Sequence, residues 1–305
     1  MFSHFFGNYL LNCRLIKPEQ LRRILDLQES VHVKLGILAI DAGYMTADQV
    51  GRVNQLQAKM DKRFGEIAVE HGYLSEAQRS QLLGQQNKRH LLISQALIDQ
   101  DILSFEQIEY VLSKYKQDSG LSEIEFEALK NNDVESIVAA LVKMPRLGDS
   151  GIYAQYFSLF IRNLIRFIDN DIYFERAAAI EQQPFDCLVY QAAEGGGYRF
   201  FTGFEGPEQA MVTFSAWHAK TVITDVDELA IDSLGEFLNI HNGLFLTSLS
   251  NELIELELMP PEFQRDGGLQ SAGALYRIPF TLSFGSFNFF IGDRTPVFSQ
   301  NNYGD

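Results

Sequence analysis

The sequence predicts two structural classes in one chain: an all-α N-terminal half built from helical-hairpin repeats, and an α+β C-terminal half. The first prediction depends on a repeat of 29 residues within residues 1–116. The second depends on the order of patterns in residues 151–305, where a long apolar helix, short strands, a second helix and more strands follow one another. Residues 117–150 lie between the halves and have the composition of a charged helical linker.

The repeat is visible in two series of equivalent positions. A glycine and a glutamine each recur at the same spacing, at Gly7, Gly36 and Gly65 with Ser94 in the fourth place, and at Gln20, Gln49, Gln78 and Gln107. Repeat proteins stack such units so that neighbouring units share a core. Four copies therefore predict four stacked units.

Each repeat contains the signals that begin and end helices. Thr46, Ser75 and Ser104 each stand three residues before a repeated glutamine, which is the Ser/Thr-x-x-Gln capping box. Gly43 and Gly72, each followed by tyrosine, are expected to form the turn after a short first helix. Each repeat is thus expected to be a short helix, a Gly-Tyr turn and a second helix of about a dozen residues.

Charge is distributed unevenly along the chain. The net charge is −15; residues 1–116 hold 14 Lys or Arg against 13 Asp or Glu, whereas residues 117–305 hold 11 against 27. An acidic second half disfavours nucleic acid and anionic membranes, because their phosphates require a basic face. A protein partner is favoured instead.

Cysteine usage and hydropathy indicate the compartment. Cys13 and Cys187 lie in different halves and give no disulfide framework, as is usual in a reducing compartment. The sequence contains no run of about 18 apolar residues, and its start lacks the basic leader of a secretory signal. We therefore expect a cytoplasmic protein without membrane insertion. The 6 histidines show no spacing typical of a metal site, so no bound metal is expected.

The C-terminal half contains strand patterns around two helices. A long apolar helix is expected from Tyr153 to Asn170, and the second helix covers residues 225–245. The expected strands are Phe185–Gln191, Tyr198–Thr202, Ala210–Trp217, Leu253–Met259, the alternating residues 276–284, and Phe287–Ile291. Between the first two strands, Glu194–Gly197 has the composition of a hairpin turn.

The second helix carries the candidate functional residues. At 3.6 residues per turn, one side is apolar and is expected in the core: Val226, Ala230, Leu234, Phe237, Leu238, Leu244 and Phe245. The opposite side is polar or small: Asp225, Asp232, Gly235, Glu236, Asn239 and Gly243. Glu236 and Asn239 lie one turn apart. Glycines on an exposed helix face cost roughly 1 kcal/mol each against alanine, which suggests that another group approaches the backbone there.

The pattern Asp232-x-x-x-Glu236-x-x-Asn239, followed after 21 intervening residues by Pro261 (20 to Pro260), resembles the signature of the CheC, CheX and FliY phosphatases of bacterial chemotaxis. In that family the proline lies about one position further on, a departure that a loop can absorb. By itself Glu-x-x-Asn occurs by chance in many helices. The leading aspartate, Gly243, the downstream prolines and the strand pattern make the resemblance more specific.

The resemblance implies a CheX-like fold, in which two long helices lie across an extended antiparallel sheet. It also implies one active site per chain, because the first helix, which reads Ser158–Asn163, has no glutamate three residues before its asparagine. CheX proteins pair through their sheets, so a homodimer through the C-terminal domain is implied. The Phe-rich strand 287–291 is a candidate for that contact, although it is equally suited to the core.

Family members hydrolyse the aspartyl phosphate of a phosphorylated CheY-type response regulator. By resemblance, Asn239 would orient the attacking water and Glu236 would dock on a lysine of the regulator, with Asp232, Gly235 and Gly243 in support. No metal of the protein's own is implied, because the regulator carries the magnesium ion. The alternative is a non-catalytic signalling scaffold that binds a response regulator, or a secretion, pilus or cyclic di-GMP component, without turnover.

The N-terminal half resembles the N-terminal domain of type II secretion and type IV pilus ATPases of the GspE and MshE type, whose tandem motifs of 29 residues bind cyclic di-GMP. The matching positions are Lys34, Gly36, Gly43 and Gln57 in the second repeat, and Arg63, Gly65, Gly72 and Gln86 in the third. Several leucines of that motif are replaced, at Ala39, Ala68, Val50 and Arg79. Cyclic di-GMP is therefore one expected ligand; the alternative is a repeat scaffold that binds protein. No GxxxxGK[ST] motif of an ATPase is present.

Overall fold

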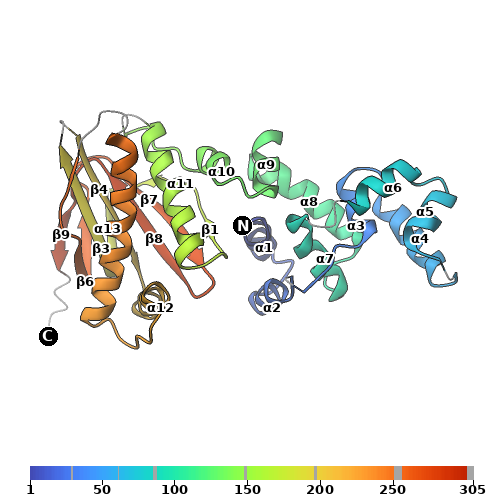
Figure 1. The fold of residues 1–305 in the computed structure, drawn as a ribbon, viewed down its shortest axis with the longest axis horizontal. Coiled ribbons are helices and arrows are strands. Elements are labelled where there is room, and N and C mark those ends of the chain that lie inside the picture. The colour runs from blue at the N-terminus through green and yellow to red at the C-terminus, as the bar shows by residue number, and fades with distance from the viewer. Residues whose placement is uncertain are drawn as a thin grey trace. The chain divides into compact units, whose positions relative to one another are not determined.

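The computed structural model describes residues 1–28, 30–60, 62–84, 88–147, 150–195, 198–250 and 256–300. The chain divides into two compact units (Figure 1), which we call the N-terminal unit, Phe2–Asp133, and the C-terminal unit, from Val134 onward. The division falls within the stretch expected to link the halves. Helix α9 (Glu123–Lys130) belongs to the first unit and α10 (Val134–Leu141) to the second.

The N-terminal unit is all-α and contains the four expected helical hairpins. The paired helices are α1 (Phe2–Asn12) with α2 (Pro18–Gln28), α3 (Leu35–Asp41) with α4 (Ala47–Gln57), α5 (Phe64–Glu70) with α6 (Glu76–Leu83), and α7 (Leu92–Asp99) with α8 (Phe105–Ser119). A short 3-10 segment, η1 (Arg89–Leu91), precedes α7. Apolar residues of the second and third hairpins share one core with residues of the fourth, as expected for stacked repeats.

The predicted capping boxes begin the second helix of three hairpins. In α4, the Thr46 hydroxyl accepts from the Gln49 N–H at 3.3 Å, and the Gln49 side chain accepts from the Thr46 N–H at 2.9 Å. The pairs Ser75–Gln78 and Ser104–Gln107 form the same box. These bonds satisfy backbone donors that have no partner within the helix, which is why the repeat conserves its spacing of three.

The turn of each hairpin has a left-handed residue at the same place in the repeat. The four positions are Arg14 (φ 56°), Gly43 (φ 67°), Gly72 (φ 73°) and Asp101 (φ 53°). Glycine adopts this conformation without a steric cost, whereas other residues strain by roughly 1–2 kcal/mol. The second and third repeats therefore have glycine at this position, whereas the first and fourth repeats form the same turn with a residue that carries a side chain.

The repeated glycines let the two helices of a hairpin approach each other. A Cβ added to Gly36 would lie 2.7 Å from Cγ1 of Val50, in the second helix of the same hairpin. A Cβ at Gly65 would lie 2.9 Å from Cδ of Arg79. Each glycine thus faces a side chain of its own unit.

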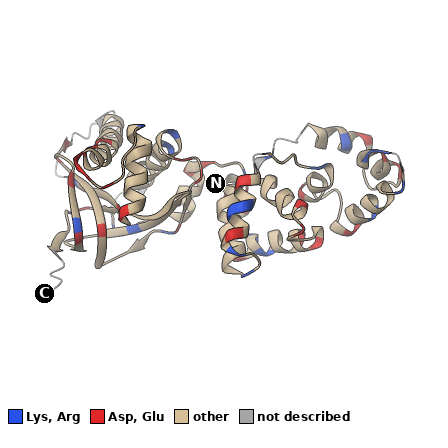
Figure 2. Ribbon diagram, turned by 90° about the horizontal axis from the view of Figure 1, so that it is seen from below, with Lys and Arg blue, Asp and Glu red and all other residues tan. Residues whose placement is uncertain are grey.

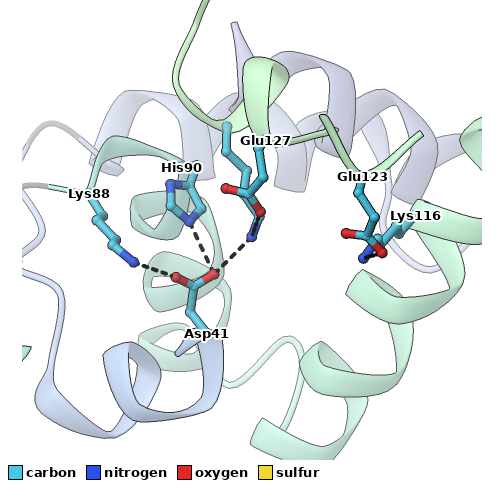
Figure 3. A network of polar contacts seen from close by, with 7 residues as sticks. Asp41, Lys88, His90, Lys116, Glu123 and Glu127 are labelled. Atoms are coloured by element: carbon cyan, nitrogen blue, oxygen red, sulfur yellow. Dashed lines mark hydrogen bonds and ion pairs between the residues drawn. The ribbon is translucent and has the colours of Figure 1, made fainter. Parts of the chain in front are cut away.

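A carboxylate at the end of α3, Asp41, joins three parts of the N-terminal unit (Figure 3). Its oxygens lie 2.9 Å from Lys88 Nζ, 3.2 Å from His90 Nε2 and 3.3 Å from Lys130 Nζ. Burial by itself would raise the pKa of Asp41, but the contacts with His90 and Lys88 and the third positive charge hold that pKa well below its usual range. Asp41 therefore ties α3 to the segment around η1 and to α9.

The C-terminal unit is an α+β domain, as the sequence predicted. Its described strands form one antiparallel sheet in the order β1-β7-β8-β4-β3-β6-β9, with β2 paired to β7 and β5 to β3. The strands are β1 (Tyr173–Phe174), β2 (Ala178–Ala179), β3 (Gln182–Gly195), β4 (Tyr198–Gly206), β5 (Glu257–Leu258), β6 (Glu262–Gln270), β7 (Leu275–Leu282), β8 (Gly285–Gly292) and β9 (Val297–Gln300).

Two long helices, α11 (Ser150–Phe167) and α13 (Glu228–Ser250), pack against one face of this sheet (Figure 1). The ring of Phe160 in α11 lies 4.5 Å from that of Phe289 in β8, and Phe237 in α13 lies 6.1 Å from Phe204 in β4. Large aromatic side chains therefore fill the layer between helices and sheet.

The opposite face of the sheet has an apolar cluster of its own. Its buried members are Phe185, Leu188, Tyr190, Phe201, Leu269, Leu275 and Phe290. The Phe-rich strand β8 contributes to both faces, since Phe287, Phe289 and Phe290 are at most 2% exposed. This strand therefore belongs to the core, which was the alternative to a role in a dimer contact. A homodimer stays a prediction.

One predicted strand is wrong: residues 210–217 belong to helix α12 (Glu208–Ala219). Their alternating pattern is typical of a strand, but the buried positions 210–212, 214 and 215 fall in two groups about one helical turn apart. The signals that begin it, Pro207 and Glu208, precede that stretch. Phe214 packs on Phe237 with ring centroids 5.0 Å apart, so α12 covers the N-terminal half of α13.

Leu244 was expected in the core and is 47% exposed, so that prediction is also wrong. Helix α12 contacts α13 near Ala230 and Phe237, whereas α11 contacts it near His241 and Phe245. The buried face of α13 therefore changes direction about the helix axis from one end of the helix to the other. Leu244 lies on the side that α12 no longer covers.

Two expected elements touch residues outside the described ranges. Of the expected strand Leu253–Met259, residues 253–255 lie outside them, and Glu257–Leu258 form β5. In the expected turn Glu194–Gly197, residues 196 and 197 lie outside, while Gly195 and Tyr198 pair across it.

Charged side chains occur throughout both units (Figure 2). In the N-terminal unit, acidic and basic residues are interspersed along the helices rather than segregated onto separate elements. Among the described helices, none is long and apolar enough to cross a bilayer.

Candidate functional site

The helix α13 presents Asp232 and Glu236 to solvent because its other side is held in the core. Asp227 begins it, since its Oδ1 accepts from the Ala230 N–H at 2.9 Å. The buried side consists of Ala230, Leu234, Phe237 and Leu238, each at most 2% exposed. The predicted face of the helix is therefore available to a partner.

A groove of about 600 Å³ runs beside this face. Its lining includes Asp232, Gly235, Glu236, Asn239 and Pro261. The structure thus brings together the predicted pair and the proline of the signature. Gly243, the remaining supporting residue, lies further along α13, and a Cβ there would meet no described atom within 4 Å.

Gly235 was expected on an exposed face but is buried, because Pro261 lies against it. A Cβ at Gly235 would lie 3.2 Å from Cγ of Pro261. The group that approaches this glycine therefore belongs to the chain itself. This contact gives a physical reason why position 235 of this chain is a glycine.

Asn239 is half-buried and is held from the sheet side. Its Oδ1 accepts a hydrogen bond from Nε2 of Gln191 at 2.9 Å, and the same nitrogen donates to the backbone oxygen of Met259 at 2.7 Å. Gln191, in β3, is 1% exposed. No sequence motif singled out Gln191, although a glutamine within the apolar run Leu188–Ala193 is a signal for a buried polar contact.

Glu236 is exposed, and no basic side chain of the described chain forms an ion pair with it. By contrast, Glu208 in the same unit pairs with Arg265 at 3.2 Å. A free carboxylate at the edge of a groove is available to a cation on a partner.

His218, in α12, is a second groove residue that the sequence did not single out. Its Nδ1 lies 3.1 Å from Oγ of Ser233, whose hydroxyl donates to the backbone oxygen of Ser215 at 3.0 Å. Because that hydroxyl hydrogen is used, Nδ1 carries the proton and Nε2 is the acceptor. Burial lowers the pKa of His218, although the charge of Glu236 acts in the opposite direction.

Two of the predicted nucleotide residues, Lys34 and Gln57, make side-chain contacts within the N-terminal unit. Lys34 Nζ pairs with Asp99 Oδ1 at 2.6 Å, and Gln57 Nε2 donates to the Lys62 backbone oxygen at 3.3 Å. Arg63 is exposed, and Gln86 lies outside the described residues. As described above, Gly36 and Gly65 face side chains of their own unit, whereas Gly43 and Gly72 form turns.

No group of three or more His, Cys, Asp or Glu side chains in the described part of the chain is arranged to hold a metal ion. No protein-family model matches the sequence, and no curated protein matches it.

Solved structures of chemotaxis proteins resemble about half of this chain. The CheX protein of Desulfovibrio desulfuricans is 13% identical over 47% of this chain and 99% of its own, with a TM-score of 0.42. A CheX from Borrelia burgdorferi, solved as a CheX–CheY–BeF3–Mg2+ complex, is 14% identical over 47% of this chain and 98% of its own, with a TM-score of 0.41. A CheC-like protein of Shewanella sp. PV-4 is 14% identical over 46% and 95%, with a TM-score of 0.41.

Proposed function

We propose that the C-terminal unit binds a CheY-type response regulator and hydrolyses its aspartyl phosphate. One observation carries this proposal. An exposed carboxylate without an ion-pair partner in the described chain, Glu236, and a carboxamide held from the sheet side, Asn239, lie one turn apart on the same groove. This arrangement supports the two roles that the sequence signature implies.

The reaction needs a water molecule placed in line with the phosphorus. The water oxygen forms a bond to phosphorus while the bond between phosphorus and the aspartyl oxygen breaks, and the electron pair of that bond returns to the aspartate carboxylate. The proton of the water passes to the phosphate or to solvent, and inorganic phosphate leaves. Such transfer depends on positioning and charge stabilisation more than on covalent help from the enzyme.

The two side chains suit these needs. Asn239 can hold a water molecule without a change of charge, because a carboxamide does not ionise near neutral pH. Glu236 can bind a lysine of the regulator and so fix the register in which Asn239 reaches the phosphoryl group. The magnesium ion that such phosphates require is expected on the regulator, as part of the substrate.

The test separates binding from chemistry. Phosphate release is measured with a regulator kept phosphorylated by a small phosphodonor. Asn239→Ala is expected to lower kcat by roughly a hundredfold, by analogy with loss of one positioned donor, with little change in KM. Glu236→Gln is expected to raise KM by roughly tenfold or more, because it removes a charge from the interface. Thr247→Ala, further along the exposed side of α13, is the control and should leave both constants unchanged.

If wild-type protein binds the regulator but releases no phosphate, the unit is a binding module. That outcome would reject the enzyme and favour the non-catalytic scaffold.

For the N-terminal unit we propose an adaptor role, with cyclic di-GMP as the ligand to test. Binding would require Lys34 to exchange Asp99 for the nucleotide, since the two form an ion pair in the described structure. In calorimetric titrations, Lys34→Ala and Arg63→Ala are each expected to weaken binding at least tenfold, because each removes a charged contact. Lys59→Ala, an exposed lysine of the same unit, is the control. No binding by wild-type protein would reject the nucleotide and favour a protein ligand.

A further inference from the structure

A chain of buried amide groups lies beneath Asn239. Gln191 donates from Nε2 to Asn239 Oδ1 and to the Met259 backbone oxygen, and its Oε1 accepts from Nδ2 of Asn242 at 2.7 Å. Asn242 is 1% exposed, like Gln191. The three amides come from β3 and from two successive turns of α13.

The deeper end of this chain is anchored as well. Nδ2 of Asn242 also lies 3.3 Å from Oγ1 of Thr202, and Oδ1 of Asn242 accepts from the Tyr156 hydroxyl at 2.5 Å. Burial raises the pKa of Tyr156 above its usual range, so the hydroxyl keeps its proton. Both polar atoms of Asn242 are therefore satisfied in one orientation.

These contacts determine the positions of the nitrogen and oxygen atoms in each side-chain amide. Nitrogen and oxygen of a side-chain amide are ordinarily hard to tell apart, and the hydrogen-bond network must decide. A backbone oxygen can only accept, so the Gln191 atom facing Met259 must be the nitrogen. The Asn239 atom that meets this nitrogen must then be the oxygen. Nδ2 of Asn239 is left on the side away from Gln191, and no described residue accepts a hydrogen bond from it.

We propose that Gln191 is a positioning residue, which holds the carboxamide of Asn239 with its nitrogen toward the groove. This inference rests on the proposed phosphatase function. The group offered to the incoming water or phosphoryl oxygen is then a hydrogen-bond donor. A water that accepts from Asn239 keeps a second lone pair for the attack on phosphorus. Preorganisation of this kind removes the need to reorient the amide during the reaction.

The kinetic test compares substitutions at Gln191 with a matched change elsewhere in the chain of amides. Gln191→Glu has nearly the same shape, but an ionised carboxylate cannot donate and a protonated one has a single O–H for the two acceptors, and Gln191→Leu removes the polar contact altogether. Thr202→Val is the control, because Thr202 is buried and contacts Asn242 but not Asn239. Both Gln191 variants are expected to lower kcat at least tenfold while their affinity for a regulator activated with beryllofluoride and Mg2+ stays within twofold.

Equal losses of kcat in Thr202→Val and in the Gln191 variants would overturn the proposal, because the effect would then be general loosening of the core. Unchanged kcat in both Gln191 variants would also overturn it. If one Gln191 variant fails to fold, the other still decides.

A second measurement does not depend on activity. Hydrogen exchange of side-chain NH2 groups, followed by NMR, should find the Gln191 protons protected, because the Gln191 side chain is buried and both protons are hydrogen-bonded, and the Asn239 protons exposed. Protected Asn239 protons would overturn the proposed orientation. If no regulator loses phosphate faster with wild-type protein, the proposed function fails, and this exchange pattern still shows whether the orientation is correct.

Discussion

His241 is an imidazole enclosed in the core of the C-terminal unit. It is fully buried, its Nδ1 lies 3.0 Å from Nδ2 of Asn163, and the ring of Tyr156 packs on it at 4.4 Å. Its Nε2 has no hydrogen-bond partner in the described chain. Burial lowers the pKa of His241 to about 3, because an imidazolium there would lose its hydration.

This histidine predicts that the C-terminal unit loses stability as the pH falls below 6.5. The unfolded chain binds a proton at the ordinary pKa of 6.5, whereas the folded chain does not until about pH 3. Protons therefore favour the unfolded state between these values. At pH 5 the contribution of His241 amounts to about 2 kcal/mol.

The measurement is urea unfolding at pH 7 and pH 5, followed by the fluorescence of Trp217, the single tryptophan, which lies in α12. On going from pH 7 to pH 5, the free energy of unfolding of wild-type protein should fall by about 2 kcal/mol more than that of His241→Leu. The variant lacks the titration of His241, and the titrations of the other groups cancel because both proteins share them. Equal losses in the two proteins would contradict the account of His241.

The candidate site shows which residue-level features a sequence can reveal. Glu236 and Asn239 are three positions apart on one helix, so their shared face follows from helix geometry. Gln191 lies in a different element from the residues it contacts, 48 positions from Asn239 and 68 from Met259. Only the packing of β3 against α13 brings them together. A polar residue in an apolar strand indicates such a contact without naming its partner.

At the scale of elements, the helical hairpins depend on glycines that differ in role. Gly36 lies where α3 crosses α4 and has no room for a side chain, because a Cβ would meet Val50 at 2.7 Å. Gly51 lies within α4, where a Cβ would meet only Glu106 Oε1, at 3.9 Å. The same substitution should therefore have opposite effects at the two positions.

We expect Gly36→Ala to destabilise the N-terminal unit by about 1–2 kcal/mol, because the clash outweighs the better helix propensity of alanine. Gly51→Ala should stabilise it by about 0.5–1 kcal/mol, since an uncrowded alanine favours the helix. Thermal unfolding monitored by circular dichroism at 222 nm measures both. Stabilisation by Gly36→Ala would show that the hairpin does not need this close approach.

Local signals predicted the N-terminal elements well. The capping boxes join residues three apart, and the turn glycines act through their own backbone, so both can be recognised without knowledge of the fold. Helix α12 was predicted as a strand, although Pro207 and Glu208 are local signals for its start. Its buried face is set by contacts with α13 and β4, and its short apolar run is compatible with either period.

At the scale of the whole molecule, the chain combines two compact units of different class. The repeat of 29 residues predicted the all-α class, and the order of helix and strand patterns predicted the α+β class. The apolar cluster on the opposite face was not predicted. Strands with both faces buried lose the alternation that distinguishes inside from outside, as in the run Cys187–Gln191 of β3.

We propose that Asn239 holds the water that removes the phosphate from a response regulator. The most direct measurement follows the decay of a CheY-type regulator labelled on its aspartyl phosphate, alone, with the wild-type full chain, and with Asn239→Ala. We expect faster decay with wild-type protein and decay at nearly the intrinsic rate with the variant, while both bind the beryllofluoride-activated regulator equally well. Acceleration that persists undiminished in Asn239→Ala would contradict it.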